Sequence, residues 1–212
     1  MAETVPVARG PVARGPIPPG PRAVVRSGWE VSDRRSRAAL RLADHSPLAK
    51  VGVRAADGGP LAARLAVPHG RAERDALDTL VVGSGPGEWL LLAAVGSAPD
   101  VAARIRGDDE FVTVLDLTHG RAMLRLSGVA ADRTLSKVCA IDLSDRVSPD
   151  GTAFRSSVAR LVTDVIRDDR DGTRSYLLHC ERSSGQYLFD ALLDAGGEWG
   201  IEPDGFDRWE AP

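Results

Sequence analysis

The chain has 212 residues, 43% of them apolar and 27% charged, with a formal net charge of −3 at pH 7. This length allows one large hydrophobic core, or two small halves that share one, and excludes two large domains. The longest apolar run, residues 89–95, is too short to span a bilayer, and two cysteines 41 positions apart exclude a disulfide scaffold. We therefore expect one folded unit, cytoplasmic and without a membrane partner.

Positive charge is concentrated at the start of the chain. Residues 1–45 contain eight Arg and four acidic residues, a net charge of +4, whereas residues 46–212 contain 19 basic and 26 acidic residues, a net charge of −7. A protein that reads DNA or RNA needs a cationic face on its folded part. The acidic body therefore argues against nucleic acid as a partner.

The composition divides the chain into a basic N-terminal extension (1–45), a folded domain (46–200) and a C-terminal tail (201–212). Residues 5–21 read VPVARGPVARGPIPPGP, and this density of Pro and Gly disfavours helices and strands. Residues 29–44 permit a short Arg-rich helix. The extension is either a disordered tail or an arm that wraps an acidic surface of a partner.

The first part of the domain is expected to form short strands and one helix. Alternating polar and apolar residues at 50–54 (KVGVR) predict a strand. Residues 60–67 (PLAARLAV) begin with Pro and repeat apolar residues at helical spacing, which predicts a helix. Residues 79–82 and 89–93 predict two strands joined by the tight loop 83–87.

The glycine-rich loop resembles a phosphate-binding loop only superficially. Such a loop passes from a strand into a helix with the spacing GxGxxG or GxxxxGK[ST], whereas Gly83, Gly85 and Gly87 alternate and lead into a strand. The glycines permit the positive φ angles of a tight connection, and Trp89 anchors the next strand. We therefore expect a β-hairpin here.

The middle of the chain is expected to continue with a helix, a strand pair and a second helix. Residues 97–106 predict the first helix, which begins with a cap and a Pro. Residues 111–117 and 122–126 predict two strands that pair through the connection 118–120. Residues 128–138 predict the second helix.

A third strand pair and a final helix complete the domain. Residues 155–167 and 175–180 predict the pair, separated by a solvated turn over residues 168–172. The sequence SSGQ at 183–186 predicts a capping box for the last helix, and the two glycines at 196–197 predict its end.

The order of these elements, βαββαβ followed by βαββα, predicts an α+β protein. A parallel sheet needs a crossover helix between each pair of strands, so helices separated by strand pairs favour antiparallel or mixed sheets with helices on one face. We expect two related βαββ-type halves of this kind.

Few residues carry a signal for chemistry. The four histidines are isolated and have no metal-binding spacing, so we expect no metal site. His119 lies in a strand connection, where it is a turn residue or, alternatively, a ligand contact. Asp164 interrupts an apolar run in a strand, and a charge there must face solvent, be paired or act on a ligand. We expect Asp164 to face solvent, with a role on a ligand as the alternative.

Six short motifs occur in a fixed order between residues 46 and 200. They are SPL at 46–48, GPGEWL at 85–90, DLTHGRA at 116–122, LSG at 126–128, KVCAIDL at 137–143 and the apolar stripe of the last helix at 187–195. Together they resemble the gamma subunit of heterotetrameric sarcosine oxidase. That family is similar in fold to the folate-binding domain of the glycine cleavage T-protein, which is an α+β architecture.

The resemblance implies a non-catalytic accessory subunit of a complex that oxidatively demethylates sarcosine or a related N-methyl amine. It implies that FAD, FMN, NAD and tetrahydrofolate are held by other chains, the alpha, beta and delta-type subunits, and that none is expected on this chain. The T-protein relatives imply an alternative, a stand-alone tetrahydrofolate-dependent aminomethyltransferase. Asp164, 48 positions beyond Asp116, is then the catalytic candidate, and Asp164 and His119 are the candidates for cofactor binding.

Overall fold

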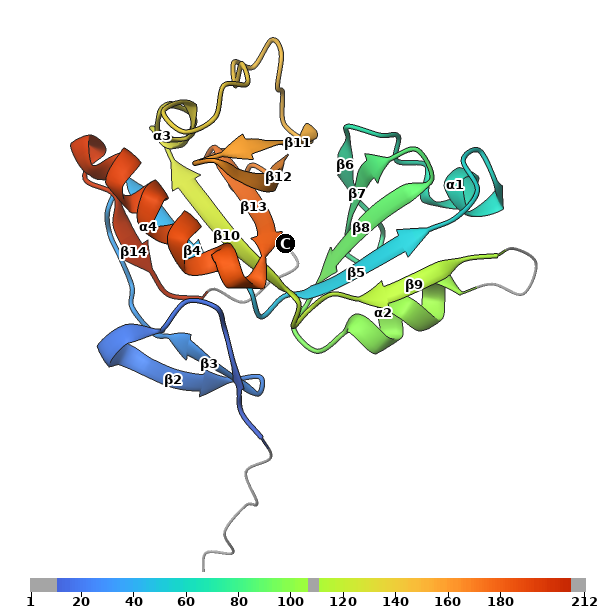
Figure 1. Ribbon diagram of the computed structural model, residues 1–212, viewed down its shortest axis with the longest axis horizontal. Coiled ribbons are helices and arrows are strands. Elements are labelled where there is room, and N and C mark those ends of the chain that lie inside the picture. Colours follow the sequence, from blue (N-terminus) through green and yellow to red (C-terminus); the bar gives the residue numbers. More distant parts are fainter. Residues whose placement is uncertain (1–10, 107–110, 207–212) are drawn as a thin grey trace, which may run out of the picture.

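Two β-sheets face each other, and a small third sheet lies below them (Figure 1). The computed structural model describes residues 11–106 and 111–206. The six-stranded sheet has the order β11-β12-β13-β10-β4-β14, and only β14 runs parallel to its neighbour. Its strands are β4 (Leu40–Asp44), β10 (Arg121–Gly128), β11 (Ala153–Val158), β12 (Leu161–Arg167), β13 (Ser175–Glu181) and β14 (Glu202–Asp204).

The five-stranded sheet is antiparallel and has the order β6-β7-β8-β5-β9. Its strands are β5 (Ala49–Arg54), β6 (Ala72–Arg74), β7 (Leu80–Gly85), β8 (Glu88–Ala93) and β9 (Thr113–Asp116). Helices α1 (Pro60–Leu65) and α2 (Ala98–Ile105) confirm the helices predicted in this part of the chain. Within the described residues, no helix is long and apolar enough to cross a membrane.

Three apolar layers hold these elements together. One lies between the six-stranded sheet and helices α3 (Ala131–Ser136) and α4 (Gly185–Gly196), and another lies between the five-stranded sheet and α1 and α2. The third layer lies between the two sheets. Met123 and Leu124 are neighbours on β10 but belong to different layers, because side chains alternate across a strand. The six-stranded and the five-stranded sheet thus each have helices on one face, and the predicted α+β class is confirmed.

The glycine-rich loop is the connection of the predicted hairpin between β7 and β8. Gly87 has a φ of +64°, and a Cβ atom there would lie 2.4 Å from Ala55 O. The indole Nε1 of Trp89 donates a hydrogen bond of 3.0 Å to Val67 O, which anchors the start of β8. The loop therefore leads into a strand, as predicted, and offers no helix N-terminus to a phosphate.

Alanine at Gly87 is expected to lower the free energy of unfolding by about 2–4 kcal/mol, because a backbone clash adds to the strain of a left-handed φ. Gly58 is the matched control: its φ is +72°, and no atom lies within 4 Å of its Cβ position. The Gly58→Ala variant carries the strain alone and is expected to cost about 1 kcal/mol. Urea unfolding of both variants measures the difference, and equal costs would contradict the clash.

Strands β9 and β10 do not pair with each other, contrary to the prediction for residues 111–117 and 122–126. β9 is an edge strand of the five-stranded sheet, whereas β10 lies inside the other sheet. Leu117 N–H donates to Lys50 O (2.8 Å), and Thr118 Oγ1 accepts from Lys50 N–H (3.1 Å). These bonds tie the connection to β5, so the chain crosses to the other sheet instead of folding back as a hairpin.

Residues 155–167, predicted as one strand, form a hairpin of β11 and β12. Ala159 and Arg160 at its turn both have positive φ angles, 48° and 69°. Two-residue hairpin turns of this kind favour Asn and Gly, so an Ala-Arg pair gives no turn signal in the sequence. The predicted pairing of this segment with residues 175–180 is confirmed through β12 and β13.

Residues 29–44 contain no helix, contrary to the sequence interpretation. Trp29–Ser32 form β3, the central strand of a three-stranded sheet with β1 (Ala13–Arg14) and β2 (Ala23–Arg26), and β4 joins the main sheet. Trp29 and Val31 alternate with polar residues and are buried, which is a strand pattern. Because β4 and β14 lie outside residues 46–200, the main sheet begins and ends beyond the predicted domain.

Helix α4 begins without the predicted capping box. Ser184 is its N-cap residue and makes no side-chain cap hydrogen bond. Gln186 Nε2 donates to Asp190 Oδ1 (2.8 Å) instead of reaching back to the cap. Ser183 lies inside a 3-10 turn over Arg182–Ser184, so it is not at the cap position of α4. The end of the helix at Gly196 is as predicted.

Candidate functional site

Asp164, the catalytic candidate from the sequence, lies in the middle of β12. The register of the sheet places it directly between Arg155 of β11 and His179 of β13. Opposite residues on antiparallel strands have side chains on the same face. These polar side chains therefore meet on the face that looks toward the five-stranded sheet, where Ile166 is buried in the middle layer.

Hydrogen bonds from both neighbours hold the Asp164 carboxylate. Arg155 donates from Nε to Oδ1 (2.7 Å) and from Nη2 to Oδ2 (3.1 Å), which is a bidentate pairing. His179 Nδ1 lies 3.2 Å from Oδ2. The Asp164 side chain is only 18% exposed. The expectation that it faces solvent is wrong, because pairing with Arg155 and His179 compensates its partial burial.

These neighbours keep Asp164 ionised. Burial raises its pKa, but the hydrogen bonds from His179 and Arg155 outweigh burial and lower the pKa to about 2. Burial lowers the pKa of His179, so its imidazole is neutral at pH 7 and donates from Nδ1. Among the described residues, no group forms a hydrogen bond with the buried Nε2 of His179. A carboxylate with so low a pKa is a weak general base at neutral pH.

The described residues form a small cavity beside Asp164. The cavity beside it has about 20 Å³ and is lined by residues from β7, β8, β11 and β12. A space of this size holds about one water molecule. The pterin ring of tetrahydrofolate does not fit in this cavity, which the described residues line.

His119, the other candidate, lies in the connection between the two sheets. Its exposed ring stacks on Trp29 of the N-terminal sheet, with ring centroids 4.7 Å apart and planes inclined by 7°. Arg182 donates both to His119 O and to Arg14 O, which ties the same sheet to this connection. In the described part of the chain, no hydrogen bond or ring contact joins His119 to Asp164. His119 therefore fastens the N-terminal sheet to the body.

A second polar cluster, which the sequence did not indicate, lies where the chain crosses between the sheets. Lys50 on β5 is fully buried, and its Nζ donates to Ser46 O (2.6 Å) and Leu48 O (2.8 Å). Burial lowers the pKa of Lys50 to about 7. The alternation in KVGVR predicts the strand correctly, but it gives no sign that both faces of the strand are covered.

A third cluster joins the two sheets through one buried carboxylate. Asp168, which is 7% exposed, accepts hydrogen bonds from Arg74 of β6 (3.0 Å), Arg125 of β10 (2.6 Å) and Arg170 (3.2 Å). Burial alone would raise the pKa of Asp168, but the three arginines have the larger effect, and the pKa is lowered from its usual value of 3.8. The prediction of a solvated turn is wrong for Asp168, because guanidinium groups replace water around it.

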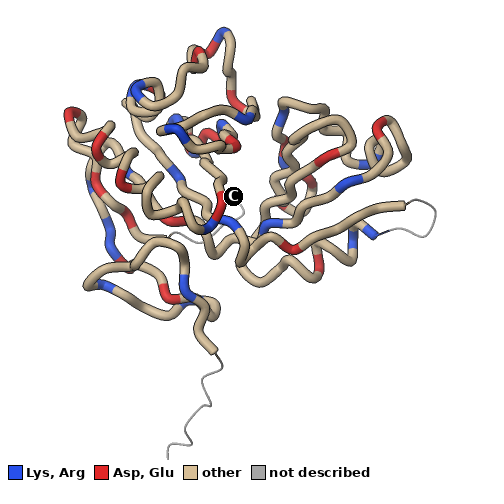
Figure 2. Tube along the Cα trace, in the orientation of Figure 1, with Lys and Arg blue, Asp and Glu red and all other residues tan. Residues whose placement is uncertain are grey.

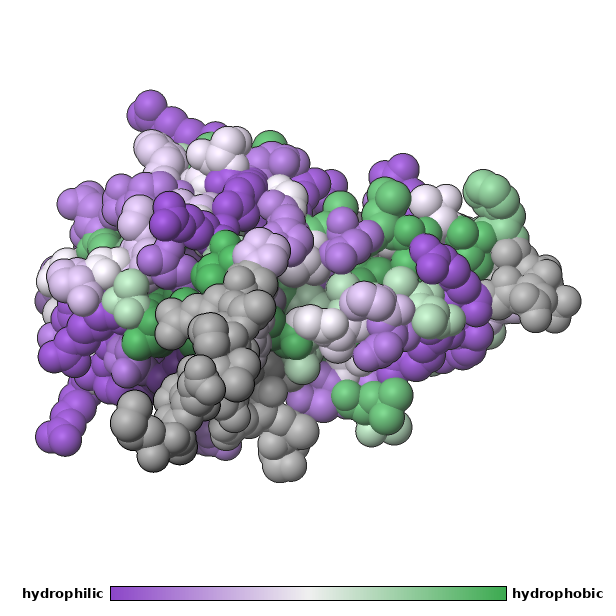
Figure 3. Space-filling model, turned by 90° about the horizontal axis from the view of Figure 1, so that it is seen from below, coloured by the Kyte–Doolittle hydropathy of each residue, from purple (hydrophilic) through white to green (hydrophobic). Residues whose placement is uncertain are grey.

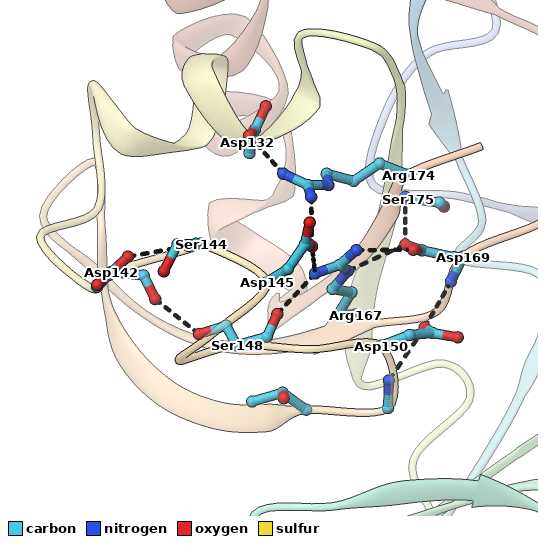
Figure 4. Close-up of polar contacts among 12 residues, drawn as sticks. Asp132, Asp142, Ser144, Asp145, Ser148, Asp150, Arg167, Asp169, Arg174 and Ser175 are labelled. Carbon is cyan, nitrogen blue, oxygen red and sulfur yellow. Dashed lines mark hydrogen bonds and ion pairs between the residues drawn. The ribbon is translucent and has the colours of Figure 1, made fainter. Parts of the chain in front are cut away.

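Arginines also fasten the long connection between α3 and β11 (Figure 4). Arg167 donates to Asp145 Oδ1 (2.6 Å) and to Asp169 Oδ2 (2.9 Å). Arg174 bridges Asp145 and Asp132. Over residues 11–106 and 111–206, no group of three His, Cys, Asp or Glu side chains could hold a metal ion. The geometry gives this network a structural role.

Residues 63–210 match the family model of the GCVT N-terminal domain. The chain is 32% identical over 127 residues to sarcosine oxidase subunit gamma of Corynebacterium sp. (strain P-1), which covers 59% of this chain and 60% of that protein. It is 28% identical over 189 residues to the subunit gamma of Corynebacterium sp. (strain U-96), which covers 84% of this chain and 90% of that protein. It is also 32% identical over 129 residues to an aminomethyltransferase of Geobacillus thermodenitrificans (strain NG80-2), which covers 60% of this chain and 35% of that protein.

Two solved structures are similar to this one. The heterotetrameric sarcosine oxidase from Corynebacterium sp. U-96, in complex with pyrrole 2-carboxylate, matches with a TM-score of 0.68 and 26% identity over 80% of this chain and 90% of that chain. The glycine cleavage system aminomethyltransferase T from Bartonella henselae matches with a TM-score of 0.73 and 15% identity over 92% of this chain and 60% of that chain. The second likeness shows the fold alone. The chain thus spans 35% to 60% of the length of several relatives that it matches.

Proposed function

Because this chain belongs to the GCVT N-terminal domain family, we propose that it is the gamma-type accessory subunit of a heterotetrameric sarcosine-oxidase-type flavoenzyme. The predicted resemblance to gamma subunits is confirmed by the sequence and structural matches. The observation that carries the proposal is coverage: the chain spans 90% of a gamma subunit and 90% of a sarcosine oxidase chain, but 35% of an aminomethyltransferase.

The contacts of Asp164 support an accessory role. Its carboxylate is occupied by Arg155 and His179, and the space beside it holds about one water molecule. A catalytic acid–base group needs an accessible site and a pKa near the working pH. The proposed reaction, oxidative demethylation of sarcosine or a related N-methyl amine, is therefore assigned to the other subunits.

The same proposal places the cofactors and partners. FAD, FMN, NAD and tetrahydrofolate are held by alpha, beta and delta-type subunits, and this chain contributes contact surface to the assembly. The complex works in the cytoplasm. The stand-alone aminomethyltransferase is the weaker alternative, because it needs Asp164 free to meet a folate.

Co-purification tests the proposed function. The full chain, produced together with the alpha, beta and delta-type subunits of its own organism, is expected to elute with them as one assembly in size-exclusion chromatography. A protein that only shares this fold is not expected to elute with the complex, because assembly needs complementary surfaces on specific partners. A chain that elutes alone beside an intact three-subunit complex would contradict the proposal.

A titration of the isolated chain with tetrahydrofolate separates the two functions. Calorimetry is expected to show no saturable heat, because the cavity that the described residues form beside Asp164 is too small for a pterin. The Asp164→Asn variant is the control for any signal. Binding by the wild-type chain that disappears in this variant would favour the aminomethyltransferase instead.

A further inference from the structure

A hollow of about 580 Å³ lies where the N-terminal sheet (β1-β3-β2) meets β14 and α4 (Figure 1). Its walls carry apolar side chains from several elements: Ile17, Pro19, Pro21, Val31, Phe189 and Phe206. Seen from below, small apolar patches interrupt a mainly hydrophilic surface (Figure 3). Small-molecule sites have volumes of about 300–1,000 Å³ and combine apolar walls with a few polar groups. The hollow therefore has the size and the walls of such a site.

One wall of the hollow is formed in advance by prolines. Residues 16–21 read PIPPGP, and each proline fixes the φ angle of its residue. Ile17 is 7% exposed and packs in the layer between the six-stranded sheet and its helices, which holds this segment against the body. A wall that is already ordered loses little conformational entropy when a ligand binds. The segment thus offers a rigid apolar surface to a ligand.

Asp44, at the end of β4, is a half-buried residue in the lining of the hollow. Its Oδ1 accepts a hydrogen bond from Ser46 N–H (2.9 Å). Across residues 11–106 and 111–206, no cationic side chain forms an ion pair with Asp44. Gly15 leaves room beside Oδ2, because a Cβ atom at Gly15 would lie 2.7 Å from that oxygen. A donor from outside the chain can therefore approach this carboxylate.

The other acidic residues that line the hollow have cationic partners within the chain. Glu30 pairs with Arg14 at 3.0 Å, Glu202 with Arg34 at 3.3 Å and Asp204 with Arg41 at 3.5 Å. In Figure 2, acidic and basic residues are interspersed along the N-terminal sheet, β4 and β14. Among the acidic residues of this lining, Asp44 is thus the one to which the described residues supply no cation.

Burial affects Asp44 more strongly than its polar neighbours do. Burial raises the pKa of Asp44 to about 6, although the hydrogen bonds from Ser46 and the charges of Lys50 and Arg182 lower it. Lys50 and Arg182 each donate to main-chain carbonyl groups instead of to this carboxylate. A carboxylate that has lost water without gaining a cation is stabilised when a cationic donor binds it.

The arginines of the lining offer less to a ligand. Arg34 donates to Glu202 Oε2 (3.3 Å), and Arg35 donates to Arg34 O (3.1 Å). Arg22 is exposed, so water solvates its guanidinium group and an anion bound there would gain little. The half-buried carboxylate of Asp44 gains more from a partner of opposite charge than this exposed cation does. The polar part of the hollow therefore selects a cation.

We propose that this hollow binds a small-molecule amine with an apolar body. The ammonium group donates to the carboxylate of Asp44, and the apolar body packs against the prolines of residues 16–21 and the rings of Phe189 and Phe206. This binding site goes beyond the proposed function and does not depend on it. Sarcosine is not such a ligand, because it is a small zwitterion without an apolar body.

NMR titration of the ¹⁵N-labelled full chain with phenethylamine at pH 7 tests the site. Saturable changes in chemical shift are expected at residues that line the hollow. The Asp44→Asn variant is expected to bind at least ~10-fold more weakly, because the ammonium group loses a charged acceptor. Asparagine keeps the Oδ1 acceptor for Ser46 N–H, so the local turn is preserved.

Asp116→Asn is the matched control. Asp116 Oδ1 accepts from Thr118 N–H (2.9 Å) with the same spacing as Asp44 and Ser46, but Asp116 is exposed and is not part of the lining of this hollow. This variant is expected to bind phenethylamine like the wild-type chain. The spectrum of each variant also reports whether the variant is folded.

Analogues of the probe test the charge on the wild-type chain itself. 2-Phenylethanol keeps the ring without the charge and is expected to bind at least ~10-fold more weakly than phenethylamine. 3-Phenylpropionate carries the opposite charge and is expected to bind more weakly still, and sarcosine is expected not to displace phenethylamine. Lowering the pH from 7 to 5 is expected to weaken the binding of phenethylamine, because Asp44 becomes protonated.

Three results would each overturn the site: shift changes that do not saturate, wild-type affinity in a folded Asp44→Asn variant, or equal or tighter binding of an uncharged or anionic analogue. Tighter binding of 3-phenylpropionate would assign the polar contact to Arg22 instead. None of these results bears on co-purification with the other subunits, so the site and the proposed function fail separately.

Discussion

Replacing Asp168 with alanine is expected to lower the free energy of unfolding by about 3–5 kcal/mol, the cost of removing one partner from a buried ion pair. Asp168 is the shared acceptor of Arg74 and Arg125, which belong to different sheets. Arg125 is itself 11% exposed, and burial already lowers its pKa. Without the carboxylate, this guanidinium stays buried beside other cations, and the contact between the sheets weakens.

Asp145→Ala is the matched control for this experiment. Asp145 also accepts hydrogen bonds from two arginines, Arg167 and Arg174, but its side chain is 70% exposed. Arg167 keeps its bond to Asp169 when Asp145 is removed. A much smaller loss is therefore expected, because water replaces an exposed partner. Urea unfolding at pH 7 measures both variants, and equal small losses would show that Asp168 does not hold the sheets together.

The free energy of unfolding is expected to rise between pH 7 and pH 9 because of Lys50. Burial lowers the pKa of Lys50 from 10.5 to about 7. In this range the folded protein has released a proton that the unfolded chain still holds, so unfolding takes up a proton and becomes less favourable as the pH rises. One such group contributes a slope of at most about 1.4 kcal/mol per pH unit.

This pH window separates Lys50 from the other buried groups. Burial raises the pKa of Cys180 from 9.0 to about 11 and that of Tyr176 from 10.0 to about 12. Both therefore lower stability as the pH rises, Cys180 from about pH 8 and Tyr176 from about pH 9, which opposes the effect of Lys50 and cannot produce a rise. Burial raises the pKa of Asp44 to about 6, so this group is largely ionised at pH 7. Burial also lowers the pKa values of His45 and His179, but their contribution to the rise ends near pH 8, where the unfolded imidazoles are neutral. Lys50 is therefore the main source of a rising slope between pH 8 and pH 9.

Chemical unfolding across this window, with Lys50→Met beside the wild-type chain, checks the prediction. Methionine keeps most of the side-chain length but cannot titrate, so the slope is expected to disappear. The overall stability is also expected to fall, because Ser46 O and Leu48 O lose a buried donor. Lys137→Met is the control, since the Lys137 side chain is 41% exposed. A slope that persists in Lys50→Met would assign the effect to another group.

The sequence predicted elements better than it predicted their partners. The hairpin at Gly87 and the helix at 60–67 follow from local signals, a Gly-rich turn and a Pro at the first helical position. β9 and β10 join different sheets instead of pairing with each other. This depends on hydrogen bonds from the connection between them to Lys50, which lies more than 60 positions away. Such long-range contacts leave no trace in the spacing of nearby residues.

The polar sites were harder to predict, because the burial of a side chain depends on segments that are distant in the sequence. Asp164 was found from the sequence since it interrupts an apolar run, but its partner His179 comes from another strand. Asp168 lies in a turn of charged residues, where solvation is the ordinary expectation. Its burial requires arginines contributed by three separate segments.

The two terminal strands of the main sheet have a practical consequence. β4 covers one edge of β10 from Leu124 to Gly128, and β14 lies beyond β4. A truncated chain limited to residues 46–200 would therefore expose a long row of unpaired N–H and C=O groups on β10. Such an open edge recruits strands from neighbouring molecules, so this truncation would form insoluble aggregates instead of a smaller version of the protein.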